Sequence, residues 1–203
     1  MSIAETPRRR RSPEVAKAEA LASARKLLLA GGPAAVTLKA VAADAGMGHA
    51  NLIHHFGSAE GLQTALMSAM AQDLADTLSD AATEFQAGRA NLNDLVRITF
   101  DAFSKQGAGE LSAWLAVTRE HGHLEAVGRS IAEISDSLSR SLGGVVPGGK
   151  TRLSQAILFV ALLAMSDAVM GRNLKTMLGQ DQDAVLKLAE QLLPVLLEIG
   201  DGR

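Results

Sequence analysis

Apolar residues recur at intervals of three and four through most of the 203-residue chain. This spacing places them on one face of an α-helix, whereas a half-buried strand would need strict alternation. The clearest example is a stripe at every fourth position, formed by Leu62, Leu66, Met70, Leu74 and Leu78. The pattern predicts an all-α fold.

Glycine, proline and N-capping residues divide this pattern into separate helices. Thr37 precedes a short apolar face and Gly46 follows it, so a helix of about two turns is expected between them. Ser58 is placed to cap the long helix that carries the stripe. The other helices are expected at residues 13–30, after Met47 as far as Phe56, and at 92–105, 110–121, 124–142, 151–178 and 182–199.

Composition excludes several classes of protein. The longest unbroken apolar run, residues 156–165, is far shorter than the ~20 residues that cross a bilayer. The first residues are basic but lead into no apolar segment, so they do not resemble a secretory signal. The chain has no cysteine, which excludes disulfides, thiolate nucleophiles and cysteine zinc sites. We expect a cytoplasmic protein with no membrane partner.

Charge is distributed unevenly along the chain. Residues 1–60 hold 8 Lys and Arg against 5 Asp and Glu, whereas the remainder holds 12 against 17. The N-terminal part is therefore positive and the rest negative, although the whole chain carries only −2. An anionic partner should be attracted to the N-terminal part.

Two short helices joined by a glycine-containing turn are predicted within residues 37–56. Packed on a preceding helix, such a pair forms a helix-turn-helix whose second helix can enter a DNA major groove about 12 Å wide. That helix offers His49, Asn51 and His54 as polar side chains. The alternative is that these residues are only solvated surface, and periodicity alone does not decide between the two.

The segment VTLKAVAADAGMGHANLIHHFGSAEGLQTAL resembles the signature of the TetR/AcrR family of transcriptional regulators. The resemblance implies that Thr37 and Lys39 contact phosphates, that His49, Asn51 and His54 face bases, and that His55 lies near the DNA backbone. The implied DNA-binding set is Thr37, Lys39, Gly48, His49, Asn51, His54 and His55.

Two positions depart from this family pattern. Ile53 stands where the family usually has a tyrosine, and Ala59 where it usually has a lysine, so two phosphate contacts are lost. The arginines at residues 8–11 could compensate, with Arg9 and Arg10 as DNA contacts in a basic arm. The alternative is a solvated, disordered tail.

Residues 144–151 read GVVPGGKT and satisfy the pattern of a phosphate-binding loop. Such a loop must follow a strand, but the preceding segment has Ile131, Ile134, Leu138 and Leu142 at helical spacing. We therefore interpret it as a turn between helices and reject the nucleotide-binding enzyme. We expect no catalytic site, no cofactor and no metal site, including one built on the histidines.

The last two helices carry more apolar residues than one packing face requires. They could pair with their symmetry mates in a four-helix bundle, as TetR proteins do, and the alternative is that they are intrachain core. The predicted dimer interface consists of Leu153, Ile157, Val160, Ala164, Leu188, Leu192 and Leu196.

The middle of the chain, from ELSAWLAVTREHGHLEAVGRS onward, resembles more loosely the regulatory domain of the betaine-regulator branch of TetR proteins. The resemblance implies a ligand cavity between the middle helices. Its candidate lining is Phe103, Trp114, Thr118, Arg119 and His121, although Phe103 and Trp114 could equally be ordinary core.

The sequence thus predicts a disordered basic arm at 1–12, a DNA-binding domain at 13–60 and a ligand-binding and dimerisation domain at 61–203. The function expected is a ligand-responsive regulator, a repressor, that binds a palindromic operator in double-stranded DNA as a homodimer. Its effector is an unidentified small molecule. The alternative is a helical protein that binds a small molecule or another protein and does not use DNA.

Overall fold

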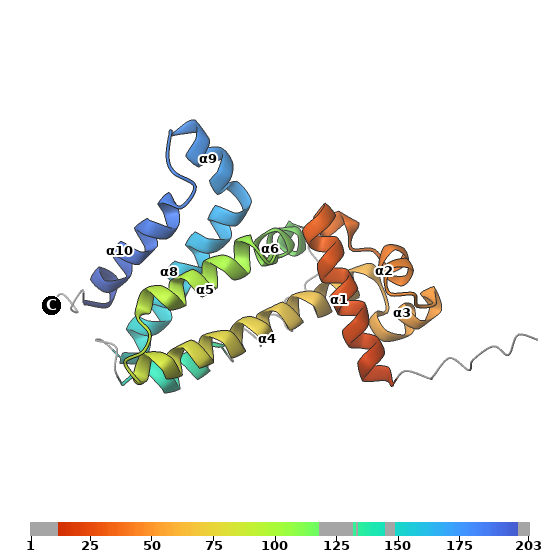
Figure 1. The fold of residues 1–203 in the computed structure, drawn as a ribbon, viewed down its shortest axis with the longest axis horizontal. Coiled ribbons are helices and arrows are strands. Elements are labelled where there is room, and N and C mark those ends of the chain that lie inside the picture. The colour runs from red at the N-terminus through yellow and green to blue at the C-terminus, as the bar shows by residue number, and fades with distance from the viewer. Residues whose placement is uncertain (1–11, 118–131, 133, 145–148, 199–203) are drawn as a thin grey trace, which may run out of the picture.

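The computed structural model describes residues 12–117, 132, 134–144 and 149–198, and these residues contain helices and no strand (Figure 1). The all-α prediction is confirmed. Residues 134–142 are also helical. The remaining elements are α1 (Pro13–Gly31), the 3₁₀ turn η1 (Pro33–Ala35), α2 (Leu38–Asp44), α3 (His49–Phe56), α4 (Ala59–Gln86), α5 (Leu92–Ser104), α6 (Ala108–Val117), α8 (Gly149–Ser166), the π-helical turn η2 (Asp167–Gly171), α9 (Arg172–Met177) and α10 (Ala184–Glu198).

Hydroxyl side chains fix where the N-terminal helices begin. The Oγ1 of Thr37 accepts from the backbone N–H of Ala40 at 3.1 Å, and the Oγ of Ser58 accepts from Gly61 at 3.0 Å. Both caps were predicted and both are confirmed. Each satisfies a helix-terminal donor and typically stabilises its helix by about 1 kcal/mol.

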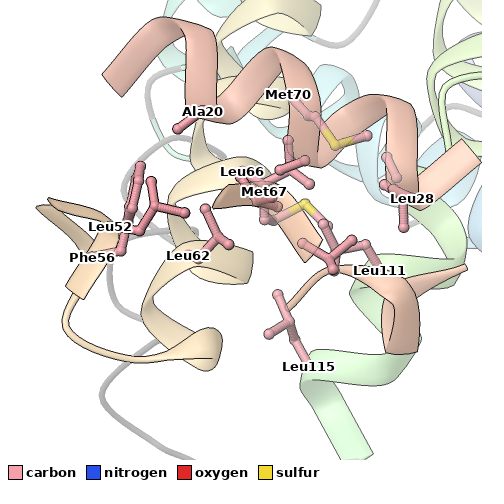
Figure 2. Packing of buried hydrophobic residues seen from close by; sticks show 14 of the residues in the cluster. Ala20, Leu28, Leu52, Phe56, Leu62, Leu66, Met67, Met70, Leu111 and Leu115 are labelled. Carbon is pink, nitrogen blue, oxygen red and sulfur yellow. The ribbon is translucent and has the colours of Figure 1, made fainter. Parts of the chain in front are cut away.

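A first hydrophobic core joins α1, α2, α3, the first half of α4 and α6 (Figure 2). Leu52 and Leu62 are completely buried in it, and Leu28 is 2% exposed. Because α6 contributes Leu111 and Leu115, this core extends well beyond residue 60. The residues labelled in Figure 2 are Ala20, Leu28, Leu52, Phe56, Leu62, Leu66, Met67, Met70, Leu111 and Leu115.

A second hydrophobic core is built from the last half of α4 together with α5, residues 134–142, α8 and α10. Its buried members include Leu78, Val96, Phe100, Leu138, Leu142, Leu153, Val160, Ala164, Leu193 and Leu197. Helix α4 has 28 residues, which gives it a length of about 42 Å, and it is long enough to enter both cores.

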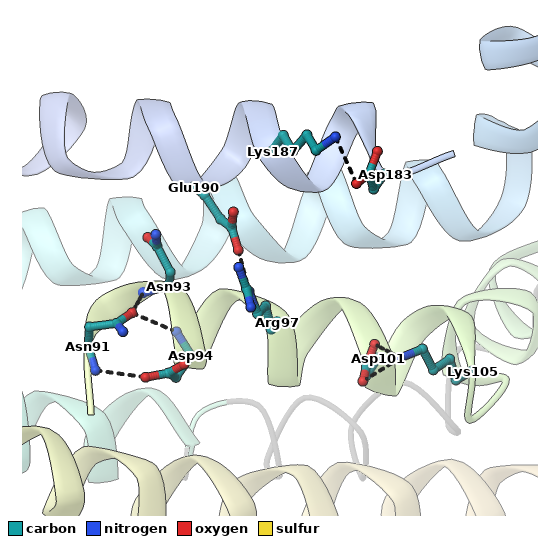
Figure 3. Close-up of polar contacts among 9 residues, drawn as sticks. All are labelled: Asn91, Asn93, Asp94, Arg97, Asp101, Lys105, Asp183, Lys187 and Glu190. Carbon is teal, nitrogen blue, oxygen red and sulfur yellow. Dashed lines mark hydrogen bonds and ion pairs between the residues drawn. The ribbon is translucent and has the colours of Figure 1, made fainter. Parts of the chain in front are cut away.

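Polar contacts on the surface define the ends and neighbours of α5 (Figure 3). Asn91 and Asp94 form a capping box, in which Asn91 Oδ1 accepts from the N–H of Asp94 at 3.2 Å and Asp94 Oδ2 accepts from the N–H of Asn91 at 2.8 Å. The guanidinium of Arg97 donates to Glu190 of α10 at 2.6 Å. The capping box therefore fixes the start of α5, and the Arg97–Glu190 ion pair joins α5 to α10 at the rim of the second core.

The stretch Gly149–Met177 is one helical run that contains α8, η2 and α9. By length and composition it could cross a membrane, with a mean hydropathy of 1.8 in its most apolar window, of which 22% is buried. The unbroken apolar run in the sequence was shorter because Ser154 and Gln155 interrupt it. Near its end, Lys175 and Asp167 form a buried ion pair at 2.7 Å. Many apolar residues of this run are exposed in the single chain, which is typical of a surface that packs against another molecule.

Gln63 is a buried polar residue that connects three elements. Its Nε2 donates to the carbonyl oxygens of Pro33 at 3.2 Å and Val36 at 3.1 Å, and its Oε1 accepts from the indole N–H of Trp114 at 3.2 Å. It therefore links α4 to the backbone just ahead of α2 and to α6. The amide thus holds in place the backbone segment that leads into the Thr37 cap of α2.

We predict that Gln63→Ala lowers the free energy of unfolding by about 1–3 kcal/mol, because the completely buried Val36 loses the donor to its carbonyl. Urea unfolding followed by circular dichroism measures the change. The matched control is Gln72→Ala on the exposed face of α4, where a change within about 0.5 kcal/mol is expected. Equal stability of the two variants would show that the amide bridge contributes nothing.

Candidate nucleic-acid interface

A tight turn joins α2 to α3. Gly46 adopts a left-handed φ of 61°, and the backbone N–H of Met47 returns to the carbonyl of Ala42 at 2.9 Å. A left-handed residue at this point is most easily glycine, because a side chain there would strain the backbone. The predicted stop at Gly46 is confirmed, and α2 and α3 form the expected helix-turn-helix.

Helix α3 is oriented by two side chains that enter the first core, Leu52 and Phe56. At about 100° per residue, Ala50 lies about 200° around the helix from Leu52, and His54 lies about 200° from both Leu52 and Phe56. His49, Asn51 and His54 are all exposed. Asn51 and His54 lie about 60° apart on the side of the helix that faces away from Leu52 and Phe56, whereas His49, in the first turn, lies about 140–160° from them. The structure therefore brings two of the three predicted base-facing side chains together on the outward face.

Two apolar residues belong to the same exposed surface, and the sequence reasoning did not include them as contacts. Ala50 is exposed, and Ile53 is 46% exposed. The sequence could have indicated the exposure of Ala50, because Ala50 lies two residues before Leu52. Two residues correspond to about 200° around a helix, so a buried Leu52 places Ala50 on the side away from the core. The outward face of α3 is thus mixed, with imidazoles, one amide and two apolar groups.

Gly61 fixes the angle between α3 and α4 and was also missed from the sequence. A Cβ at this position would lie 2.1 Å from the carbonyl oxygen of Phe56. Only glycine permits this approach, because the atom in the way belongs to the backbone. Glycine destabilises a helix relative to alanine. Its presence in the first turn of α4 could therefore have indicated, from the sequence, a position at which another chain segment approaches closely.

Groups suited to phosphates flank this surface. Thr37 and Lys39 are exposed at the start of α2, and the Thr37 hydroxyl can still donate while it accepts from Ala40. Gly48 precedes α3, and no side chain caps that helix. Backbone N–H groups at a helix N-terminus need partners, and a phosphate is a suitable one. Arg9 and Arg10 lie outside the described residues.

Some basic side chains near this surface are paired with carboxylates of the same chain and are therefore less available to bind DNA phosphates. The ammonium of Lys26 donates to Asp44 at 2.5 Å, and this hydrogen bond holds the pKa of the Asp44 carboxyl below its ordinary value. The pKa of Glu14 is lowered by hydrogen bonds from its own backbone N–H and from Ser12, and to a lesser degree by the charge of His55. Half-buried His55 is therefore near an anion of its own chain.

The segment that resembles a phosphate-binding loop follows a helix. Residues 134–142 are helical, Gly143 and Gly144 form a turn, and Gly149, Lys150 and Thr151 begin α8, while residues 145–148 lie outside the described part. The strand that such a loop requires is thus replaced by a helix, as the spacing of Ile134, Leu138 and Leu142 indicated.

Phe103 is the one predicted pocket residue that the structure places on a cavity. It lines a space of about 160 Å³ in the second core. Trp114 instead lies on α6, 40% exposed, with its indole N–H on Gln63. Thr118, Arg119 and His121 lie outside the described residues.

The predicted dimer residues divide into two groups. Leu188 and Leu192 are 48% and 40% exposed, as an interface requires. In contrast, Leu153, Val160 and Ala164 are buried in the second core of the same chain, and Ile157 and Leu196 pack against that core. Helix α8 is apolar on two faces, and the exposed one carries Leu158 and Leu162. Periodicity alone did not reveal which face would turn inward.

Comparison with known proteins supports the helix-turn-helix directly. Residues 20–66 match the model of bacterial regulatory proteins of the tetR family. No curated protein matches the chain.

Solved structures share the fold of the chain. A TetR-family transcriptional regulator from Mesorhizobium loti is 13% identical, with a TM-score of 0.64 over 94% of this chain and 98% of that one. Reduced NemR from E. coli is 18% identical, with a TM-score of 0.63 over 89% and 96%. The multidrug-binding protein EbrR, complexed with ethidium, is 16% identical, with a TM-score of 0.59 over 90% and 99%. Residues 20–66 thus match a tetR-type DNA-binding domain, and the chain shares its overall fold with TetR-family regulators.

We predict that alanine at His49, Asn51 or His54 weakens specific DNA binding by about 1–3 kcal/mol per base-facing residue and relaxes sequence preference. Lys39→Ala should instead weaken binding to all sequences alike and reduce the salt slope by about 1. Fluorescence anisotropy with a selected DNA site and with random DNA, each over a range of salt concentrations, separates the two effects. An equal loss on both DNAs for all four variants would contradict the assignment of the α3 side chains to bases.

Proposed function

We propose that this protein is a TetR-family transcriptional regulator, a cytoplasmic, ligand-responsive repressor that binds a palindromic operator as a homodimer. The observation that carries the proposal is the exposed surface of α3, which is anchored by the buried Leu52 and Phe56. Asn51 and His54 project from the side opposite this anchor, and His49 is exposed in the first turn. A recognition helix must combine this buried anchor with an exposed polar face in order to enter the major groove.

The chemistry of α3 suggests what it recognises. Asn51 can pair with the N6 and N7 edge of adenine, and the imidazoles of His49 and His54 can donate to or accept from base edges. Ala50 and Ile53 offer apolar contact to thymine methyl groups. Thr37, Lys39 and Gly48 would hold phosphates on one side, with His55, Arg9 and Arg10 as additional backbone contacts.

Dimerisation follows from apolar surface that the chain leaves uncovered. Leu188, Leu192 and Val195 form an exposed stripe at positions i, i+4 and i+7 of α10, and Leu158 and Leu162 are exposed on α8. Helices α8 and α10 pack against each other, and each carries exposed apolar residues that a partner could cover. A two-fold partner presenting the same surface would complete a four-helix bundle and bring two α3 helices to successive major grooves.

Ligand control is supported by the cavity in the second core. Its walls include Leu74 and Leu78 of α4, and the same helix anchors the first core through Leu62 and Leu66. A ligand that favours one position of α4 would thereby favour one spacing of the two α3 helices. A coupling of about 1–3 kcal/mol changes operator affinity by 5- to 150-fold.

We predict that the double variant Leu162→Glu, Leu188→Glu is monomeric and binds its operator far more weakly, because four buried carboxylates would have to be desolvated in the bundle. Sedimentation velocity and anisotropy measure the two effects. Leu29→Glu on α1, where the leucine is 55% exposed, is the matched control and should remain dimeric. A double variant that stays dimeric, or a monomer that retains full operator affinity, would contradict the proposed dimer.

A further inference from the structure

The cavity in the second core is lined almost entirely by apolar side chains. About 160 Å³ in volume and open on one side, it is lined by side chains from α4, α5, residues 134–142, α8 and α10. Among the described residues that line it, Thr99 carries the only polar side chain. The Thr99 hydroxyl donates to the carbonyl of Leu95 at 3.0 Å and so has its donor already engaged. No charged side chain from the described residues reaches the cavity wall.

This lining selects against ionic ligands. A cation moved from water into an apolar site loses its hydration, and the loss must be offset by a carboxylate or by the faces of aromatic rings. The described lining contains no carboxylate and a single aromatic ring, Phe103. Ethidium, which EbrR is shown to bind, is such a cation.

Volume restricts the ligand further. An apolar protein cavity of about 150 Å³, lined by Leu, Ile and Phe, stays dry and accepts benzene. The cavity here is similar in size and in its residue types. We infer that its ligand is a neutral, compact, hydrocarbon-like molecule with the bulk of one aromatic ring. This inference rests on the proposed function in taking the cavity as the effector site.

Phe103 sets the upper limit of ligand size. A second cavity of about 80 Å³ adjoins the first, and the two share Leu74, Phe103 and Ile134 in their walls. The smaller cavity is also lined by Met67 and Met70, which are buried members of the first core. Phe103 is thus the largest side chain common to the ligand space and to the smaller cavity that Met67 and Met70 line. Shortening this side chain joins the two cavities and makes the space half as large again.

The test uses benzene, naphthalene and ethidium as probes, with binding to the full chain measured by calorimetry. The unchanged protein should bind benzene, bind naphthalene weakly and not bind ethidium. Phe103→Leu should raise naphthalene affinity about tenfold or more while benzene affinity changes less. Phe85→Leu, at a phenylalanine that packs against the same core outside both cavities, is the matched control and should leave the preference unchanged.

A filling variant keeps the test independent of any loss of stability. Ala161 lies on the wall of the larger cavity, and Ala161→Leu should abolish benzene binding while circular dichroism shows an intact fold. Ethidium binding that exceeds benzene binding would overturn the inference, as would benzene binding that survives Ala161→Leu. A naphthalene affinity that Phe103→Leu leaves unchanged would overturn the role of Phe103.

Operator affinity measured with and without each probe distinguishes this inference from the proposed function. If benzene binds in the cavity and operator affinity stays the same, the ligand class stands and the ligand-responsive part of the proposed function fails. If ethidium releases DNA and no hydrocarbon binds, the ligand class fails and ligand control of DNA binding stands.

Discussion

Helix α4 is packed at one end into the core that holds the recognition helix and at the other end into the core that contains the cavity. Leu62 and Leu66 are buried with Leu52 of α3, whereas Leu78 and Ala82 are buried with the residues of α5, α8 and α10. Neither core can repack without affecting this helix. The interior of a protein is close-packed, so a shift at one end of α4 is transmitted as a displacement rather than absorbed.

Two further contacts make the N-terminal end of α4 rigid. Gly61 allows the helix to approach the backbone of Phe56, and Gln63 holds the carbonyls of Pro33 and Val36 ahead of α2. Both ends of the helix-turn-helix are therefore fixed to α4. A displacement of α4 would therefore carry α3 with it, as the proposed ligand control of DNA binding requires.

The sequence predicted features that depend on neighbouring residues. The caps at Thr37 and Ser58, the stop at Gly46 and the apolar stripe of α4 each involve residues within a few positions, and the structure confirms them. It did not predict features that depend on distant partners. The amide of Gln63 reaches residues about thirty positions earlier and fifty later, and no periodicity records such a contact.

The proposed dimer surface also depends on contacts between distant parts of the chain, which the sequence pattern does not record. Helix α8 has apolar residues on opposite faces, and the sequence favoured the one that contains Leu153, Val160 and Ala164. That face packs in its own chain because α5 and α10 lie against it, which leaves Leu158 and Leu162 outside. A helix that is apolar all round must be covered on all sides, but its sequence does not indicate which neighbour belongs to the same chain.

Two copies of α3 should contact DNA together, held at a fixed separation by the proposed dimer. Footprinting of DNA fragments selected from a random pool is then expected to show an inverted repeat with two protected half-sites whose centres lie about 34–36 Å apart, one helical turn, or a multiple of that distance. Protection of a single half-site, or of random fragments with no enriched sequence, would contradict it.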